Sequence, residues 1–366
     1  MKFRIQRCRF LEGIKAVQNI VGAKGSLPVL QNVLLEADGG SLKMTTTDLD
    51  ISIRSEVEAE VIESGKTTLP VKLLFNSISK VVEGDVEVEM NENEKAVIKA
   101  GSAKFMLNGI AELEFPRLPQ GENYYTYTVT QSVLKKMLSM TSYAASQDDT
   151  RRTLKGVLMS FKEGSLTLVA TDGRRMALVK QEVEFPVEKE KDIILPFKAV
   201  QELHRSLGNE GDIEITVQNS QISFRIGNTV IYSKMIDDVY PNYRQVIPVS
   251  CEKTIEVDRQ LLINALERAS VMSMDEAHST KLIFKDNMLT VTAVASEVGE
   301  VKDEVDIKYI GEEVEIMFNP SYVMDPLKTM DDDMITFNLN DGHSPAVIKC
   351  TTNDCFLYVI MPLRVN

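Results

Sequence analysis

The sequence is poor in the residues and motifs on which most enzymes depend. Only three histidines occur, His204, His278 and His343, and they lie far apart in dissimilar contexts. The motifs GxSxG, HExxH and CxxC and a Walker-type phosphate-binding loop are absent. A hydrolase that uses Asp172 and His204 stays open as an alternative, but no assembled triad or metal set accompanies this pair. We therefore expect a protein that is not an enzyme and that uses no cofactor or metal.

Cysteines and long apolar runs are also scarce. The four cysteines, Cys8, Cys251, Cys350 and Cys355, show no spacing typical of a metal or redox site, which favours reduced thiols in a cytosol. No apolar stretch reaches the roughly 18 residues that a membrane span needs. The N-terminal segment MKFRIQRCRF has no apolar core that would serve as a secretion signal. These features predict a cytoplasmic protein that does not contact a membrane.

The chain lacks an excess of basic residues. Its 366 residues include 41 lysines and arginines against 54 aspartates and glutamates, a formal net charge of −13. Such a balance argues against a nucleic-acid binder held by a broad basic face. The length favours two or three domains over a single core.

The chain contains a repeated pattern. Residues 32–48, NVLLEADGGSLKMTTTD, align without a gap with residues 156–172, GVLMSFKEGSLTLVATD. A weaker third copy, KLIFKDNMLTVTAVASE at residues 281–297, aligns if one residue is deleted at the turn. In each copy apolar residues alternate on both sides of a polar turn, which predicts a β-hairpin.

Further landmarks recur in the same order. Residues 67–81 match residues 193–207 and, more distantly, residues 316–330, while FPRLP at 115–119 matches YPNYRQVIP at 240–248. Each copy starts near a helical pattern, for which Ser132 and Asp258 are expected N-caps in the second and third copies. We therefore predict an α+β protein of three repeated domains, each with two helices against antiparallel sheet. The expected domains span residues 1–121, 126–249 and 253–366.

The ordered set LPVLQNVLL, VATDGRRMAL, YPNYRQVIP and YVIMPLR resembles the family of bacterial DNA polymerase III beta subunits, the sliding clamps, over the whole chain. The resemblance implies three domains of the DNA clamp fold and a non-catalytic processivity factor. It also implies a head-to-tail homodimer that closes a six-domain ring around double-stranded DNA, independently of DNA sequence. A repeat-built peptide-binding scaffold with no role on DNA is the alternative from a different class.

The resemblance also implies a cleft between the second and third domains that binds linear motifs of partner proteins. Expected partners are the DNA polymerase III catalytic subunit, the clamp loader, other polymerases and mismatch-repair or ligase-type proteins. Arg174, Gln245, His343 and Pro345 depart from the family pattern near this cleft, so the preferred motif is expected to differ in detail. The cleft residues carried over are Leu154, Thr171, Gly173, Arg174, Arg175, Met176, Pro241, Tyr243, Val246, Val359, Met361 and Pro362.

The distribution of charge is compatible with a ring around DNA. Six helix-like segments together carry a formal charge of +7, so the rest of the chain carries −20. A topologically closed ring needs only weak, salt-sensitive phosphate contacts. These helix-like segments are residues 9–24, 70–81, 131–145, 196–208, 258–270 and 319–330. The resemblance implies that Lys24, Gln147, Arg151 and Lys198 face DNA.

The resemblance places the dimer seam on a strand of the first domain and a region of the third. Phe105 and Leu107 are expected to meet Val271 and Met272, and Lys104 to face acidic residues. A solvated edge strand whose charges prevent misassociation is the plainer and compatible interpretation. The acidic residues are Glu297, Glu300, Asp303 and Glu304. The run MDDDM at residues 330–334 is interpreted as an exposed turn that leads into a strand, rather than as a metal site.

Overall fold

The computed structural model describes most of the chain, in two compact units. The first unit comprises residues 1–133 and 201–235, and the second comprises residues 134–200 and 236–366. Lys24, His278, Glu297 and most of the expected boundary at 121–126 lie outside the described residues. The described ranges are 1–22, 27–91, 94–118, 125–186, 189–218, 220–273, 279–295, 298–352 and 354–364.

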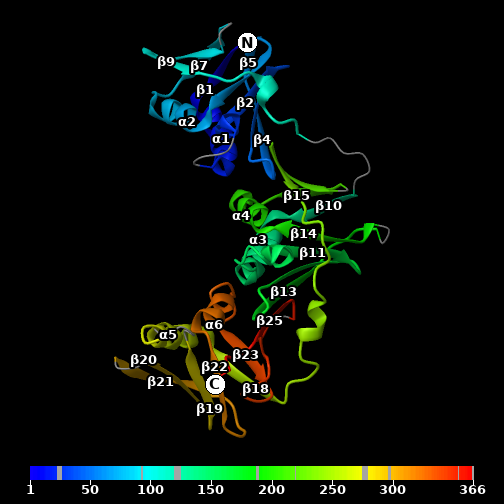
Figure 1. Cartoon of the computed structure of the whole chain (residues 1–366), viewed down its shortest axis with the longest axis vertical. Helices are drawn as coiled ribbons and strands as arrows, with labels where there is room; N and C mark the ends of the chain where they lie inside the picture. Colours follow the sequence, from blue (N-terminus) through cyan, green and yellow to red (C-terminus); the bar gives the residue numbers. More distant parts are fainter. Residues whose placement is uncertain are drawn as a thin grey trace. The chain divides into compact units, whose positions relative to one another are not determined.

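The first unit holds two antiparallel sheets (Figure 1). One has the order β5 (Glu60–Glu63), β1 (Lys2–Gln6), β7 (Asp85–Met90), β8 (Lys95–Ala100), β9 (Ala103–Asn108). The other has the order β10 (Tyr125–Thr130), β15 (Asp212–Val217), β16 (Gln221–Ile226), β17 (Thr229–Lys234), β4 (Ile51–Glu58), β3 (Ser41–Thr47), β2 (Asn32–Asp38), β6 (Gly65–Pro70). Helices α1 (Arg7–Val17) and α2 (Val71–Lys80) pack in this unit. The β4–β17 pair makes the sheet continuous between the first and second repeats.

The second unit holds one antiparallel sheet that joins the second and third repeats through β13 and β25. Its order is β14 (Lys191–Pro196), β11 (Gly156–Lys162), β12 (Ser165–Thr171), β13 (Arg175–Glu182), β25 (Phe356–Ile360), β24 (Ala346–Cys350), β23 (Met334–Leu339), β18 (Lys253–Asp258), β21 (Gly299–Lys308), β20 (Met288–Ala295), β19 (Thr280–Lys285), β22 (Val314–Phe318). Helices α5 (Arg259–Ser270) and α6 (Pro320–Leu327) pack on each other here. Helices α3 (Gln131–Thr141) and α4 (Phe197–Ser206) each include a boundary between the units.

The three predicted hairpins are confirmed as β2–β3, β11–β12 and β19–β20. The deletion expected at the third turn is wrong, because all three hairpins have two-residue turns. Both turn residues adopt positive φ, as a tight turn matched to the twist of the strands requires. Asp286 and Asn287 tolerate this conformation well enough to replace glycine. The turn pairs are Gly39–Gly40, Glu163–Gly164 and Asp286–Asn287.

One of the two predicted helix caps is confirmed. The Asp258 carboxylate accepts a hydrogen bond of 2.8 Å from the Leu261 amide at the start of α5, which satisfies an otherwise unpaired donor. Ser132 does not cap α3, because that helix already begins at Gln131. The side chain of Gln131 accepts instead from the amide of Gly208, at 2.9 Å.

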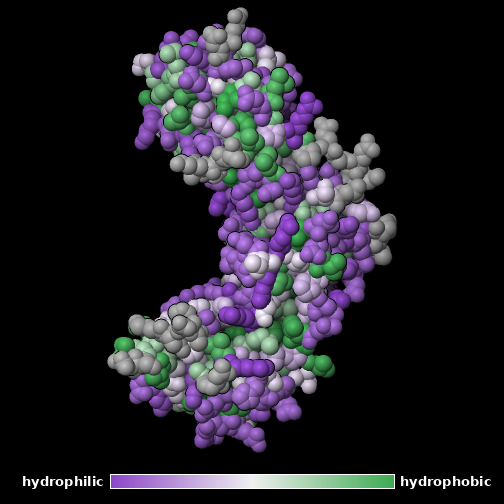
Figure 2. All heavy atoms as spheres, viewed as in Figure 1, coloured by the Kyte–Doolittle hydropathy of each residue, from purple (hydrophilic) through white to green (hydrophobic). Residues whose placement is uncertain are grey.

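The helices carry the net positive charge that the sequence predicted. Within the observed bounds α1, α2 and α3 each carry +2, α4 and α5 each +1, and α6 −1, which totals +7. Part of this charge is engaged inside the chain, since Lys136 donates to the Thr329 carbonyl at 2.7 Å and pairs with Asp331 at 2.8 Å. Figure 2 shows a mainly polar face with hydrophobic residues in small groups.

The acidic run at residues 330–334 is a turn that leads into β23 at Met334, as predicted. Asp332 accepts a hydrogen bond from the Thr352 amide at 3.2 Å, and its carbonyl accepts from Arg259 at 2.7 Å. Among the described residues, no group of three side chains is placed to hold a metal ion. No helix in the described ranges is long and apolar enough to cross a membrane.

The cysteines differ enough in environment to predict different reactivity. Burial, followed by a hydrogen bond with Asp332, raises the pKa of Cys350 to about 12, whereas Cys8 is exposed at the start of α1. Because the thiolate is the nucleophile, iodoacetamide at pH 8 is expected to alkylate Cys350 at least about a hundredfold more slowly than Cys8. Peptide mass spectrometry over time measures both rates. Equal rates in the native protein would contradict the environment described for Cys350.

Candidate functional site

A compact apolar cluster spans the junction of β13 and β25. Met176 on β13 lies opposite Val359 on β25, and the two side chains are 1% and 2% exposed. The other buried members come from β11, β12, β14 and β24. The cluster therefore combines strands of the second and third repeats. Those other members are Leu158, Val169, Ile194 and Val347.

The segment that connects the two repeats covers part of this cluster. Tyr240, Tyr243 and Ile247 pack against it and are partly buried. Val246, in the short 3₁₀ helix Tyr243–Val246, is 47% exposed, and Met361, just after β25, is 43% exposed. The junction thus presents exposed aliphatic side chains close to a well-packed apolar floor. We refer to this region as the junction surface.

The predicted cleft residues fall into three groups. Met176 and Val359 are buried and form part of the apolar floor of the junction surface. Five residues are exposed: Gly173, Arg174, Pro241, Val246 and Met361. Five are partly buried: Leu154, Thr171, Arg175, Tyr243 and Pro362. The prediction therefore grouped buried supporting residues with exposed ones, and the role of this region in binding partners stays a prediction.

The turn between β12 and β13 is rigidly held. The Asp172 carboxylate accepts from the amides of Arg174 at 2.8 Å and Arg175 at 3.0 Å, and Gly173 adopts a φ of +87°. Such a side-chain-supported turn favours Asp and Gly at these positions. The Arg174 carbonyl accepts from the Met361 amide at 2.9 Å. The turn therefore fixes the backbone that carries an exposed side chain of the junction surface.

The first repeat contains the same turn without the arginines. There the Asp48 carboxylate accepts from the amides of Asp50 at 3.0 Å and Ile51 at 2.8 Å, and Leu49 has a φ of +81°. The backbone turn therefore requires the aspartate but neither arginine. Arg174 and Arg175 have roles other than forming this turn.

Arg175, one of the predicted cleft residues, is largely buried beneath the turn. Its side chain is only 10% exposed, and its guanidinium pairs with Asp172 at 3.1 Å and with Asp325. It also donates to the Tyr143 carbonyl at 2.8 Å and lies 4.1 Å from the centre of the Tyr322 ring. Every nitrogen of the group is engaged within the chain. Arg175 thus ties β13 to α6 and supports the junction surface from inside.

Arg151, predicted to face DNA, contacts this turn. Its guanidinium donates to the Asp172 carbonyl at 2.9 Å, and a Cβ atom at Gly173 would lie 3.0 Å from it. The side chain is still half exposed, so it borders the junction surface. Gln147 and Lys198 are exposed, on a loop and on α4.

The residues that depart from the family pattern lie on exposed or partly exposed backbone. Gln245 is exposed in the 3₁₀ helix, and His343 is exposed in the loop before β24. In that loop the Asp341 carboxylate accepts from the amides of His343 at 2.8 Å and Ser344 at 2.7 Å, and these bonds lower its pKa. Pro345 follows and is partly buried.

Sequence reasoning missed the aromatic supports of the site. The Tyr358 hydroxyl donates to the Tyr322 carbonyl at 2.7 Å, and burial raises the pKa of Tyr358 above its ordinary value. Tyr240 is also largely buried, and burial raises its pKa. The only available signal was that Tyr240–Pro241 repeats Phe115–Pro116. That match indicated a connecting segment. It did not indicate that Tyr240 packs against the apolar cluster.

Three sequence models that together cover almost the whole chain match it. They describe the N-terminal, central and C-terminal domains of the DNA polymerase III beta subunit, at residues 1–119, 128–242 and 244–364. The chain belongs to the DNA polymerase III beta subunit family.

Full-length relatives carry the name of this family. The "Beta sliding clamp" of Chlamydia muridarum is 35% identical over 366 residues, and that of Escherichia coli is 30% identical over 367 residues, with complete coverage of both chains in each case. The crystal structure of the Pseudomonas aeruginosa DNA polymerase III subunit beta has a TM-score of 0.97 at 32% identity, again with complete coverage of both chains. Sliding clamps are non-catalytic processivity factors, which removes the hydrolase alternative. Asp172 is in fact occupied by turn amides and Arg175.

Two strand edges of the structure carry residues of the predicted seam. Among the described strands β9 pairs only with β8, and β21 pairs with β18 only through Glu256–Lys308 and Val257–Ile307. Residues 299–305 of β21 therefore pair on one side only, with β20. Asp303 and Glu304, which Lys104 was expected to face, already pair with Arg268 and Lys302 within the chain.

Proposed function

We propose that two copies of this chain close head to tail into a ring that encircles double-stranded DNA and tethers the DNA polymerase III catalytic subunit. The match to the sliding-clamp family over the entire chain is the observation that carries this function. Open edges at β9 and at the start of β21 supply the backbone groups that a closing strand pair needs. A replication factor of this kind works in the cytoplasm.

We assign the seam to the two strand edges. Phe105 and Leu107 from β9 would pack on Val271 and Met272 after α5, and Lys104 would face Glu297 and Glu300. Asp303 and Glu304 would border the same contact. The domains would span residues 1–121, 126–249 and 253–366.

The junction surface is assigned to the linear motifs of partners. Val246 and Met361 are exposed beside a floor that also contains a methionine, and flexible methionine side chains suit a surface that accepts several ligands. Arg174 and Arg151 are exposed cations at its edge. The partners would be the polymerase, the clamp loader, other polymerases and mismatch-repair or ligase-type proteins.

DNA contact would be weak and non-specific. Several helix cations are engaged inside the chain, as Lys136 is, so phosphate binding depends on few side chains. A ring held by topology loses little from weak contacts and slides more easily. Lys24, Gln147, Arg151 and Lys198 remain the assigned DNA-facing residues.

Retention on circular DNA tests this function against a scaffold with no role on DNA. After loading with ATP and a clamp loader, the protein is expected to stay on nicked circular DNA during gel filtration and to leave within minutes once the DNA is linearised. The variant Leu107→Asp, at the assigned seam, is expected not to be retained because a buried charge opposes closure. Equal release from circular and linear DNA would contradict the ring.

A further inference from the structure

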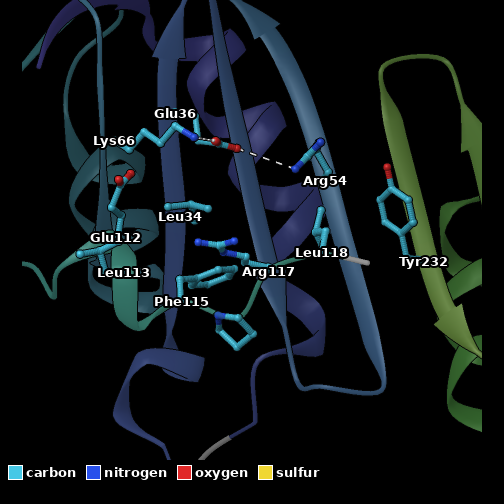
Figure 3. A pocket seen from close by; sticks show the side chains of 11 residues that line it. Leu34, Glu36, Arg54, Lys66, Glu112, Leu113, Phe115, Arg117, Leu118 and Tyr232 are labelled. Carbon is cyan, nitrogen blue, oxygen red and sulfur yellow. Dashed lines mark ion pairs between the residues drawn. The ribbon is translucent and has the colours of Figure 1, made fainter. Parts of the chain in front are cut away.

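The first unit contains a pocket of about 800 Å³ on the sheet that joins the first and second repeats (Figure 3). Its wall combines strand residues Leu34 and Arg54 with Tyr232 of β17. Its other side is the connecting segment 112–118, which includes Phe115 and Arg117. The volume lies within the range of ordinary ligand sites.

This pocket corresponds to the junction surface of the second unit. Ser52 pairs with Tyr232 across β4 and β17, and Met176, 124 residues after Ser52, pairs with Val359 across β13 and β25. Leu34 likewise corresponds to Leu158 of the apolar cluster. In both units a segment that starts with an aromatic residue and a proline, Phe115–Pro116 or Tyr240–Pro241, crosses the junction. The repeat thus builds two related sites.

The chemistry of the two sites differs. Arg54 replaces Leu178, and Glu36 on β2 is bound by Lys66 at 2.7 Å and by Arg54 at 3.8 Å. The pKa of Lys66 is raised, mainly by its hydrogen bond to Glu36. Glu36 is thus already neutralised by cations of the pocket. The pocket of the first unit therefore has charged side chains, whereas the junction surface of the second unit has aliphatic ones.

Two groups of the pocket lack a hydrogen-bond partner among the described residues. Arg117 is exposed and, within the described part of the chain, makes neither a hydrogen bond nor an ion pair, and Figure 3 shows its guanidinium directed into the pocket. The Glu112 Oε2 atom is buried and accepts no hydrogen bond from the described residues. Such a buried acceptor is costly unless a ligand supplies a donor.

We propose that this pocket is a second docking site, which takes an extended peptide segment with a carboxylate between apolar side chains. The carboxylate of the peptide pairs with Arg117. The apolar side chains contact Leu34 and Phe115, with Leu113, 86% exposed, at the mouth. The Glu112 carboxylate in the wall disfavours a phosphate dianion. The kind of ligand rests on the proposed role as a docking platform, whereas the pocket itself does not.

Methyl NMR of the full-length protein tests the site directly. Probes are acetyl-Leu-Asp-Leu-amide, the matched acetyl-Leu-Asn-Leu-amide and inorganic phosphate at equal ionic strength. The aspartate peptide is expected to shift the methyls of Leu34, Leu113 and Leu118 to saturation. Arg117→Glu, or the asparagine peptide, is expected to weaken this binding by at least about tenfold, because a charge-assisted bond is lost.

Arg174→Glu at the junction surface is the matched control and is expected to leave these shifts intact. Shifts confined to Leu154, Val246 and Val359 would overturn the proposal, as would equal binding by the Arg117→Glu variant. Phosphate that shifts the same methyls with equal affinity would show a simple anion site and overturn the peptide assignment. The DNA-retention assay does not use this pocket, so failure of the ring and failure of this site are separate results.

Discussion

Replacing Arg175 with alanine is expected to destabilise the second unit by about 3 kcal/mol, the lower end of the cost of breaking a buried ion pair. The substitution leaves Asp172 and Asp325 facing each other across the vacated space without their shared cation. It also removes the donor to Tyr143 and the cation above the Tyr322 ring. The partial exposure of Asp325 keeps the expected cost from being larger.

Urea unfolding followed by circular dichroism, at fixed protein concentration, measures this effect. Arg174→Ala is the matched control, and because that side chain is exposed, a change within about 0.5 kcal/mol is expected. Combining Arg175→Ala with Asp325→Asn is expected to cost less than the sum of the two single changes, since the second removes the unpaired charge. Equal midpoints for Arg175→Ala and Arg174→Ala would show that Arg175 is not a structural tie.

The sequence indicated that the turn does not require Arg174 and Arg175. It did not indicate that Arg175 is largely buried whereas Arg174 is exposed. In the sequence, VATDGRR of the second repeat aligns with TTTDLDI of the first, which lacks the arginines, and the Asp48 and Asp172 turns show that both segments form the same turn. The Arg175 side chain is engaged within the fold because it pairs with Asp325, which lies 150 residues away along the chain. No local pattern signals such a pairing. Arg174, one residue earlier, precedes β13 and is exposed.

The strand arrangement was easier to predict from the sequence than the exposure of individual side chains. Alternation and turn chemistry fixed the three hairpins, because one buried face and a two-residue turn leave little freedom. Which side chains are buried at the junction depends on how the connecting segment crosses the sheet. The sequence alone therefore could not show that Met176 and Val359 are buried whereas Met361 is exposed. The pocket of the first unit was missed for a similar reason. Its charged residues Arg54, Lys66 and Arg117 come from three segments that only the fold brings together.

A chain with both Val246→Ala and Met361→Ala is expected to bind the DNA polymerase III catalytic subunit about 100-fold more weakly, a loss of about 2.7 kcal/mol. The two truncations remove several methyl and methylene groups, each worth about 0.8 kcal/mol when fully buried by a ligand. Both side chains are nearly half exposed in the unbound chain, so the folded structure depends little on them. Surface plasmon resonance with the polymerase subunit measures the loss.

The control for this variant is a second double substitution, Ile62→Ala with Leu73→Ala, at two similarly exposed aliphatic residues of the first unit. It is expected to leave polymerase affinity within about twofold, because its side chains lie outside both docking sites. The junction variant must also unfold at the same urea concentration as the parent, or the loss would reflect folding. Unchanged polymerase binding with intact folding would refute the assignment of the junction surface. The polar pocket of the first unit would then be the candidate site for the polymerase, and Arg117→Glu would test it.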